Sequence, residues 1–197
     1  LGVGFTILRV VSSKWLQYSF YVCVLVGLIL VFFSVYLASG YPKEWGHNFG
    51  HLFKVWKVWK FGYVNWAGEW YGGYPFERFY PPLAYFFGGF YAGLVNSDVL
   101  GYKLVNVTSM VASLVTTYYV TKKVGMNFYQ SSVASIFYAF SIWSLVTPLE
   151  GGFSRYLAAG LAPLLPLVFL SVCDLRVGKK SLVASGLLVG TMVLIHH

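Results

Sequence analysis

The stretch PPLAYFFGGFYAGLV, Pro81 to Val95, is apolar and carries no charge, yet it is short for a membrane span. As a helix rising about 1.5 Å per residue, Pro82 to Val95 would reach only about 21 Å, and the hydrocarbon core of a bilayer is about 30 Å thick. The pattern therefore predicts an interfacial or re-entrant helix. Whether this segment crosses decides how every later segment crosses.

The rest of the chain has the composition of an integral membrane protein. Hydrophobic residues make up 58% of the 197 residues, and charged residues only 10%. Soluble domains carry a far larger charged fraction. The sequence thus predicts an all-α, polytopic membrane protein with about five transmembrane helices of about 20 residues each. The predicted spans are 15–42, 104–121, 124–149, 156–173 and 181–197.

Both ends of the sequence look cut. The first residue is Leu1 rather than methionine, and the last apolar run is short before it stops at His196 and His197. We expect residues 1–197 to form a single transmembrane domain that is the N-terminal part of a longer protein.

The basic residues favour the topology in which Pro82 to Val95 does not cross. Lys122 and Lys123 then share the cytoplasmic side with the chain's N-terminus, as the positive-inside rule requires. If the segment crossed, these two lysines would lie outside. Residues 40–103 accordingly form a long first outer loop. The predicted cytoplasmic bases are Arg9, Lys14, Lys122, Lys123, Arg176, Lys179 and Lys180.

The positive-inside rule also explains the net charge of +8, because most of the basic residues lie at the ends of apolar segments. We therefore expect membrane lipids as partners and no nucleic acid. The acids gather on the outer side, although acids contribute little to orientation. Either function or a chance split explains this asymmetry. The candidate catalytic carboxylates are Glu44, Glu69, Glu77 and Glu150.

The beginning of the outer loop predicts an amphipathic helix on the membrane surface. Leu52, Val55, Trp56 and Trp59 recur at helical spacing, while the lysines at 54, 57 and 60 fall on another arc. Two roles remain open for the lysines. They either anchor the helix by reaching towards the headgroups, or they bind the phosphate of a lipid headgroup.

Two further pairs in the outer loop are candidates for interaction. His47 and His51 are four residues apart, so on a helix they share a face and could hold a metal ion with Glu44. Histidines that only donate and accept hydrogen bonds are the alternative. Glu77 beside Arg78 predicts an ion pair just before Tyr80.

Three stretches together resemble the prokaryotic membrane proteins called 6-pyruvoyl-tetrahydropterin synthase-related. They are GHNFGHLFKVWK (46–57), GGYPFERFYPPLAYFFGG (72–89) and LEGGFSRYLAAGLAPLLPL (149–167). That family is similar in layout to the C superfamily of glycosyltransferases, which take sugars from polyprenyl-phosphate carriers. The resemblance implies a multi-pass protein of a prokaryotic plasma membrane, with its N-terminus in the cytoplasm.

The resemblance also implies an activity and a site. The activity is inverting transfer of a sugar from a polyprenyl-phosphate-linked donor at the outer membrane face, with a divalent Mg or Mn ion as the expected cofactor. A carboxylate would deprotonate the acceptor hydroxyl and cations would neutralise the leaving phosphate. The expected substrate-binding residues are His47, Asn48, His51, Lys54, Lys57, Arg78, Tyr80 and Arg155.

One position departs from the family's pattern. The motif after the first span commonly reads Gly-His-Asp, and here it reads Gly46-His47-Asn48. An amide cannot act as a general base at neutral pH. Either Glu44 or another outer acid replaces it, or the protein binds or moves lipid-linked glycans without catalysis. A structural subunit of a cell-surface assembly is the third alternative.

Overall fold

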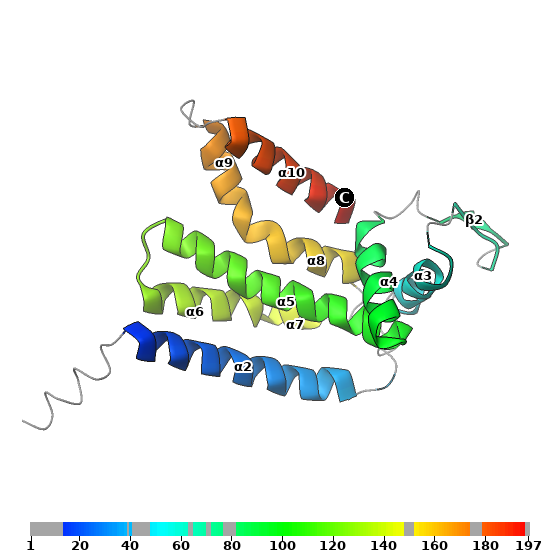
Figure 1. Cartoon of the computed structure of the whole chain (residues 1–197), viewed down its shortest axis with the longest axis horizontal. Helices are drawn as coiled ribbons and strands as arrows, with labels where there is room; N and C mark the ends of the chain where they lie inside the picture. Colours follow the sequence, from blue (N-terminus) through cyan, green and yellow to red (C-terminus); the bar gives the residue numbers. More distant parts are fainter. Residues whose placement is uncertain are drawn as a thin grey trace, which may run out of the picture. The chain divides into compact units, whose positions relative to one another are not determined.

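The computed structural model describes residues 14–38, 40, 48–62, 65–69, 72–76, 82–147, 152–173 and 179–195 (Figure 1). The chain divides into two compact units, Leu1–Ser39 and Gly40–His197. Helices make up nearly all of the described residues, and strand is confined to one small hairpin. The all-α prediction is therefore confirmed for the described part of the chain.

The first unit contains one long helix, α2 (Lys14–Ala38). Its 25 residues would extend about 38 Å at about 1.5 Å per residue, enough for a hydrocarbon core of about 30 Å. The apolar stretch Leu16–Leu30 lies within it. Helix α2 therefore corresponds to the first predicted span, 15–42, and ends at Ala38.

The second unit begins with an amphipathic helix, a hairpin and a short helix. Helix α3 (Asn48–Phe61) falls where the sequence predicts a surface helix. Strands β1 (Trp66–Ala67) and β2 (Tyr74–Pro75) pair antiparallel. Helix α4 (Leu83–Val95) has 13 residues, so the predicted short helix in this region is confirmed.

A two-residue turn joins α4 to α5 (Asp98–Lys123). Asn96 ends α4 in the left-handed conformation, with φ of 52°, which asparagine tolerates better than most residues. Ser97 then caps α5, because its side chain accepts a hydrogen bond from the backbone N–H of Leu100. The sharp turn brings Gly101 against the backbone of Ala92.

Helix α5 is the central element of the second unit. It packs against α3, α4, α6 and α8. Asp98 in its first turn and Lys122 and Lys123 in its last turn complement the helix dipole. Within the described ranges α5 is the one helix both long and apolar enough to cross a membrane by length and composition. Helix α2 is long enough, but the apolar stretch identified within it, Leu16–Leu30, is shorter than a span, and the remaining predicted spans correspond to shorter helices. The number of five spans therefore stays a prediction.

The predicted span 124–149 is not one continuous helix. Helix α6 (Phe128–Ala139) ends and α7 (Ile142–Val146) begins after two residues. Serines take over the hydrogen bonds lost at this break. Ser141 Oγ accepts from the N–H of Ser144, while Ser144 Oγ donates to the carbonyl of Tyr138.

The predicted span 156–173 is also interrupted, and proline is the physical reason. Helix α8 (Phe153–Leu161) passes into the 3-10 turn η1 (Ala162–Leu164) and then into α9 (Leu165–Cys173). Pro163 lacks the N–H that would bond the carbonyl four residues earlier. That carbonyl, of Ala159, accepts from the hydroxyl of Tyr138, 2.9 Å away, and from the backbone N–H of Ala162. Figure 1 shows α9 leaving in a different direction from α8.

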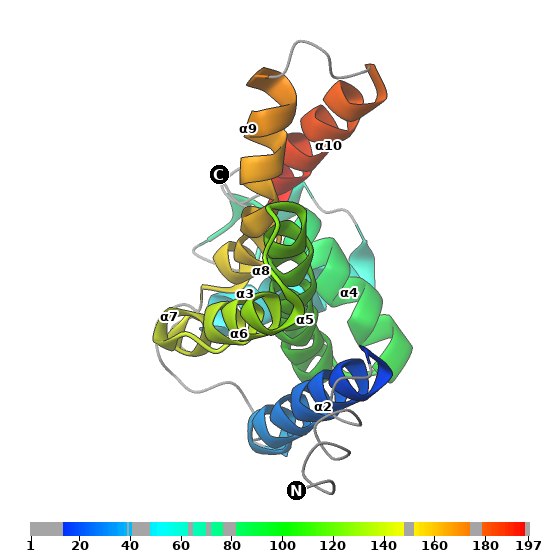
Figure 2. The ribbon, with the colours of Figure 1, turned by 90° about the vertical axis from the view of Figure 1, so that its left-hand side faces the viewer.

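Helix α10 (Lys179–Ile195) packs against α8 and α9 and completes the second unit. Figure 1 places α3 and α4 at the end of α5 where that helix begins, with the turn to α6 at the opposite end, and Figure 2 shows the molecule from the side of that turn. The buried core lies at the first of these ends, between α3, α4, α5 and α8. It includes Val55, Ala84, Tyr102, Val105 and Phe153.

Candidate functional site

Three of the predicted substrate-binding residues lie on one inward face of α3. Asn48, His51 and Lys54 are three residues apart, a spacing that keeps them on one side of a helix. All three are buried, with 1%, 6% and 6% of their surface exposed. They face the helices that pack on α3 rather than open solvent.

Glycines on α4 let the two helices approach closely. A Cβ atom at Gly88 would lie 2.5 Å from Val55 Cγ2, and one at Gly89 would lie 2.9 Å from Val58 Cγ1. Close approach of this kind needs residues without side chains. Gly88 and Gly89, at the end of the second resemblance stretch, therefore have a packing role that brings α3 and α4 together.

Two tyrosine hydroxyls hold the inward face of α3. The hydroxyl of Tyr102, on α5, donates to Asn48 Oδ1 across 2.5 Å. The hydroxyl of Tyr85, on α4, lies 2.7 Å from His51 Nδ1. Lys54 Nζ lies over the ring of the same Tyr85, 5.2 Å from its centroid. A buried polar group is tolerated only with such partners.

A phenylalanine from α8 completes the cluster. The ring of Phe153 is fully buried and stacks on Tyr102 at 4.7 Å and on Tyr85 at 5.7 Å between centroids. The ring of His51 lies 5.8 Å from it. We call this cluster the polar–aromatic junction, and four helices contribute to it. Its members are Asn48, His51, Lys54, Tyr85, Tyr102 and Phe153.

Burial lowers the pKa of Lys54 from 10.5 to about 7. The cause is desolvation, which disfavours the charged ammonium form. An amine with a pKa near neutrality populates both protonation states, and it can therefore neutralise an anion or accept a proton. Perturbed groups of this kind gather at functional sites, although buried structural groups show them too.

Lys57 forms an ion pair with Glu69, a residue of the loop that follows β1. The hydrogen bond from Lys57 is the first cause that lowers the pKa of Glu69. A carboxylate with a lowered pKa stays ionised but is a weaker base. Of the four candidate catalytic carboxylates, Glu69 is the one the structure describes, and its pairing makes it a poor candidate for that role.

The exposed basic face predicted for α3 is wrong in part. Lys54 and Lys57 are buried, at 6% and 7% exposure, and only Lys60 of the three lysines is exposed. The physical reason is that α4 packs on the side of α3 that carries Lys54, while Glu69 draws Lys57 into a pair. Arg155, on α8, is exposed and is not a member of the junction.

Several predicted residues lie outside the described part of the chain, so their roles stay predictions. The predicted Glu77–Arg78 ion pair and one histidine of the predicted metal pair are among them. They are Glu44, His47, Glu77, Arg78, Tyr80 and Glu150.

The predicted magnesium or manganese site falls mainly on Glu44 and His47, which lie outside the described residues. Within the ranges the structure describes, no three His, Cys, Asp or Glu side chains form a group that could hold a metal ion. These ions prefer several oxygen ligands, and Asn48 Oδ1 already accepts a hydrogen bond from Tyr102. The predicted cofactor stays an expectation.

Sequence reasoning missed three members of the junction. Tyr85 and Phe153 lie in two of the resemblance stretches, and this could have marked them as candidate site residues. Tyr102 lies at the beginning of α5, and its sequence neighbourhood carries no signal that would have singled it out.

The comparisons with known proteins agree with the membrane character of the chain. No curated protein and no solved structure matches it. One protein-family model matches residues 77–197, a region that includes Tyr85, Tyr102 and Phe153 and more than half of the chain. The chain therefore belongs to the family described as the 6-pyruvoyl-tetrahydropterin synthase related domain, a family of membrane proteins.

Proposed function

We propose that this membrane protein is a glycosyltransferase that moves a sugar from a polyprenyl-phosphate-linked donor to an acceptor at the outer face of a prokaryotic plasma membrane. The proposed topology is multi-pass with the N-terminus in the cytoplasm, in agreement with the distribution of lysines and arginines. The region 40–103 then lies outside and contains the junction's α3 and α4 residues.

One observation carries this proposal. The three stretches that resemble the 6-pyruvoyl-tetrahydropterin synthase-related family are far apart in the sequence, yet each contributes to the polar–aromatic junction. The first contributes Asn48, His51 and Lys54, the second Tyr85 and the third Phe153. Stretches that only packed a membrane bundle would not need to bring a histidine, a lysine and an amide together, because buried polar groups are costly.

The proposed chemistry is a single displacement with inversion at the anomeric carbon. A carboxylate accepts the proton of the acceptor hydroxyl, whose oxygen forms a bond to the anomeric carbon. The bond from that carbon to the phosphate oxygen breaks, and polyprenyl phosphate leaves with the electron pair. Glu44 and Glu150 are the proposed bases, since Glu69 is paired with Lys57. Glu77 stays a further candidate.

Cations would stabilise the charge that develops on the leaving phosphate. Lys54 suits this role because its pKa of about 7 leaves a protonated fraction at neutral pH. Arg155 is exposed and always charged. The proposed phosphate-binding residues are Lys54, Lys57, Arg78 and Arg155, and the proposed sugar- or acceptor-binding residues are His47, Asn48, His51 and Tyr80.

A second function is favoured by Asn48. Its side-chain oxygen is buried and accepts a hydrogen bond from Tyr102, as a carboxylate at this position would. The junction can therefore form without an acid at this position. This supports a protein that binds or moves a lipid-linked glycan and does not catalyse transfer.

The test is a transfer assay in membranes with radiolabelled polyprenyl-phosphate sugars, paired with a donor-binding assay on the purified full-length protein. Transfer that is lost in Glu44→Gln or Glu150→Gln and retained in Tyr129→Phe, a change at an exposed position on α6, supports the enzyme and the site. Transfer unaffected by either glutamate change contradicts the site. Binding without transfer supports the second function, and neither binding nor transfer contradicts both.

A further inference from the structure

Two strongly exposed aromatic side chains belong to the segments that form the Lys57–Glu69 ion pair: Phe61 lies in the same helix as Lys57, and Trp66 precedes Glu69 by three residues in the hairpin. Phe61, at the end of α3, and Trp66, on β1, are 60% and 59% exposed. Lys57 Nζ lies 4.8 Å from the centroid of the Phe61 ring and pairs with Glu69. We call this surface the aromatic shelf, and it consists of Phe61, Trp66 and Glu69 with Lys57 beneath.

The Trp66 ring is held in place although it is exposed. Gly73 has a φ of +106°, and a Cβ atom at this position would lie 2.6 Å from Trp66 Nε1. The indole therefore packs directly on the backbone of Gly73, which a side chain there would prevent. Trp66 is also paired with Pro75 in the hairpin. A ring held in this way loses little further freedom when a ligand packs on it.

The charge of the shelf favours a ligand that donates hydrogen bonds and carries no negative charge. The Lys57 side chain is only 8% exposed, whereas Glu69 is 50% exposed. A ligand on the shelf therefore meets a carboxylate, and the pKa of that carboxylate is lowered, so it stays ionised. Sugar hydroxyls can donate to a carboxylate, but a phosphate headgroup would be repelled by it.

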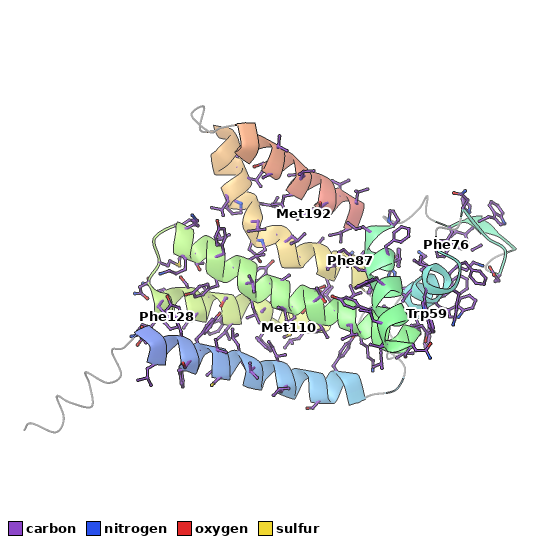
Figure 3. All side chains as sticks on the ribbon, viewed as in Figure 1. Trp59, Phe76, Phe87, Met110, Phe128 and Met192 are labelled. Atoms are coloured by element: carbon purple, nitrogen blue, oxygen red, sulfur yellow. The ribbon has the colours of Figure 1, made fainter. Side chains whose placement is uncertain are left out.

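The position of the shelf separates it from the hydrocarbon of the bilayer. In Figure 3, Trp59 on α3 and Phe76 after β2 lie beyond the end where α5 begins, Met110 lies along α5, and Phe128 lies at the far end. If α5 crosses the bilayer along its own axis, α3 and the hairpin lie outside the hydrocarbon. Exposed apolar surface with polar groups at its rim is typical of binding sites.

The exposed face of α4 is different and serves as a comparison. Phe86, Phe87, Phe90 and Leu94 are exposed there, and α4 from Leu83 to Val95 carries no charged residue. Such a face suits contact with lipid chains.

We propose that the aromatic shelf binds a neutral glycan, with a pyranose ring stacked on the exposed side of Trp66 and a sugar hydroxyl donating to Glu69. Flat aromatic rings with a nearby polar group suit ligands that have an apolar face and a polar edge, as pyranoses do. The inference rests on the proposed function for its choice of a glycan. It adds a binding place for the acceptor or for the sugar chain, separate from the polar–aromatic junction.

The binding test uses the full-length protein in lipid nanodiscs and a panel of neutral gluco-, galacto- and manno-oligosaccharides, followed by saturation-transfer NMR and calorimetry. We expect at least one to bind, and Trp66→Ala to weaken it by about 3- to 10-fold, the range of an aromatic contact. Trp66→Phe should retain most of the affinity, and Phe90→Ala should change nothing. Binding by none of the panel, or equal loss in Phe90→Ala, overturns the inference.

A labelling test checks the position independently. Trp66→Cys and Phe90→Cys are made in a Cys23→Ser, Cys173→Ser background and treated with a membrane-impermeant maleimide in nanodiscs. We expect labelling at 66 and none at 90, with both labelled after denaturation. Protection of position 66 in nanodiscs assigns the shelf to the lipid and overturns the inference.

The two proposals fail separately. Sugar transfer without oligosaccharide binding contradicts the shelf and leaves the proposed enzyme standing. Oligosaccharide binding that depends on Trp66, without any sugar transfer, contradicts the enzyme and leaves the shelf standing.

Discussion

The hydroxyl of Tyr102 donates a hydrogen bond to Asn48 Oδ1 across 2.5 Å, and this bond joins the beginning of α5 to the beginning of α3. The two residues are 54 positions apart in the sequence. Both are almost completely buried, at 0% and 1% exposure. The bond therefore fixes helix α3 on the end of the helix most suited to cross the membrane.

Loss of this hydroxyl should destabilise the protein. Tyr102→Phe keeps the ring that stacks on Phe153 but removes a buried donor, which costs about 1–3 kcal/mol. Thermal unfolding in detergent should show a lower Tm. Tyr129→Phe, at an exposed position on α6, is the control and should leave Tm unchanged. Equal Tm values for Tyr102→Phe and the parent protein would contradict this prediction.

The close crossing of α4 and α5 should depend on Gly101. A Cβ atom there would lie 2.6 Å from the backbone nitrogen of Ala92, which cannot rotate away. Gly101→Ala should cost about 1–3 kcal/mol by overpacking. Gly186→Ala on α10, where no atom lies within 4 Å, should be neutral or slightly stabilising. Chemical denaturation of both variants measures the difference, and a Gly101→Ala protein as stable as Gly186→Ala would rule out the close contact.

Stability should rise with pH because of Lys54. Its pKa is about 7 in the folded protein and 10.5 ordinarily, so the unfolded chain binds more protons between these values. The free energy of unfolding therefore increases as pH rises from about 7 towards 10.5. Below pH 7 the amine is charged in the folded protein as well, and the full cost of burying that charge lowers stability.

The matched variants for this prediction are Lys54→Met and Lys60→Met. Lys54→Met removes the buried amine, so we expect a flatter Tm profile between pH 7 and 10 and a higher Tm at neutral pH. Lys60→Met removes an exposed lysine from the same helix and should leave the slope as it is. A profile that is equally steep in Lys54→Met and the parent protein would assign the pH dependence to other groups.

The Tyr138 hydroxyl should matter more because residue 163 is proline. It donates to the carbonyl of Ala159, whose helical partner would be the N–H that Pro163 lacks. Tyr138→Phe should cost about 0.6–2 kcal/mol, as for hydrogen bonds between membrane helices. In a Pro163→Ala background the backbone N–H of residue 163 is restored, and the same change should cost less. A double-mutant cycle measures this coupling, and independent effects of the two changes would refute it.

The position of Lys123 tests the topology. If α4 does not cross the bilayer, the turn after α5 lies in the cytoplasm, as the positive-inside rule favours. Lys123→Cys, without Cys23 and Cys173, should resist an impermeant maleimide added to intact cells and react after permeabilisation. Labelling in intact cells would mean that α4 crosses, and the proposed outer site would lose its geometry.

The membrane character, the helical fold and the short helix that begins after Pro82 could be predicted from the sequence. These properties depend on local composition and length, because a hydrocarbon core requires helices of a certain length and rejects charge. The helix α3 was predicted on the same local basis, whereas the candidate substrate-binding residues Asn48, His51 and Lys54 came from the resemblance to a known family. The breaks near Ser141 and Pro163 were missed, because apolar runs read as continuous spans even where proline interrupts them.

Only the tertiary structure decided which side chains meet. Periodicity assigned the α3 lysines to an exposed face. The burial of Lys54 depends on α4, which packs on that side of α3, and the burial of Lys57 depends on its ion pair with Glu69 in another loop. The same holds for Tyr85, Tyr102 and Phe153, which come together because Gly88 gives room for the Val55 side chain and Gly101 lies against the backbone of Ala92. Composition and spacing describe one helix at a time, whereas a site formed by four helices depends on how their surfaces pack.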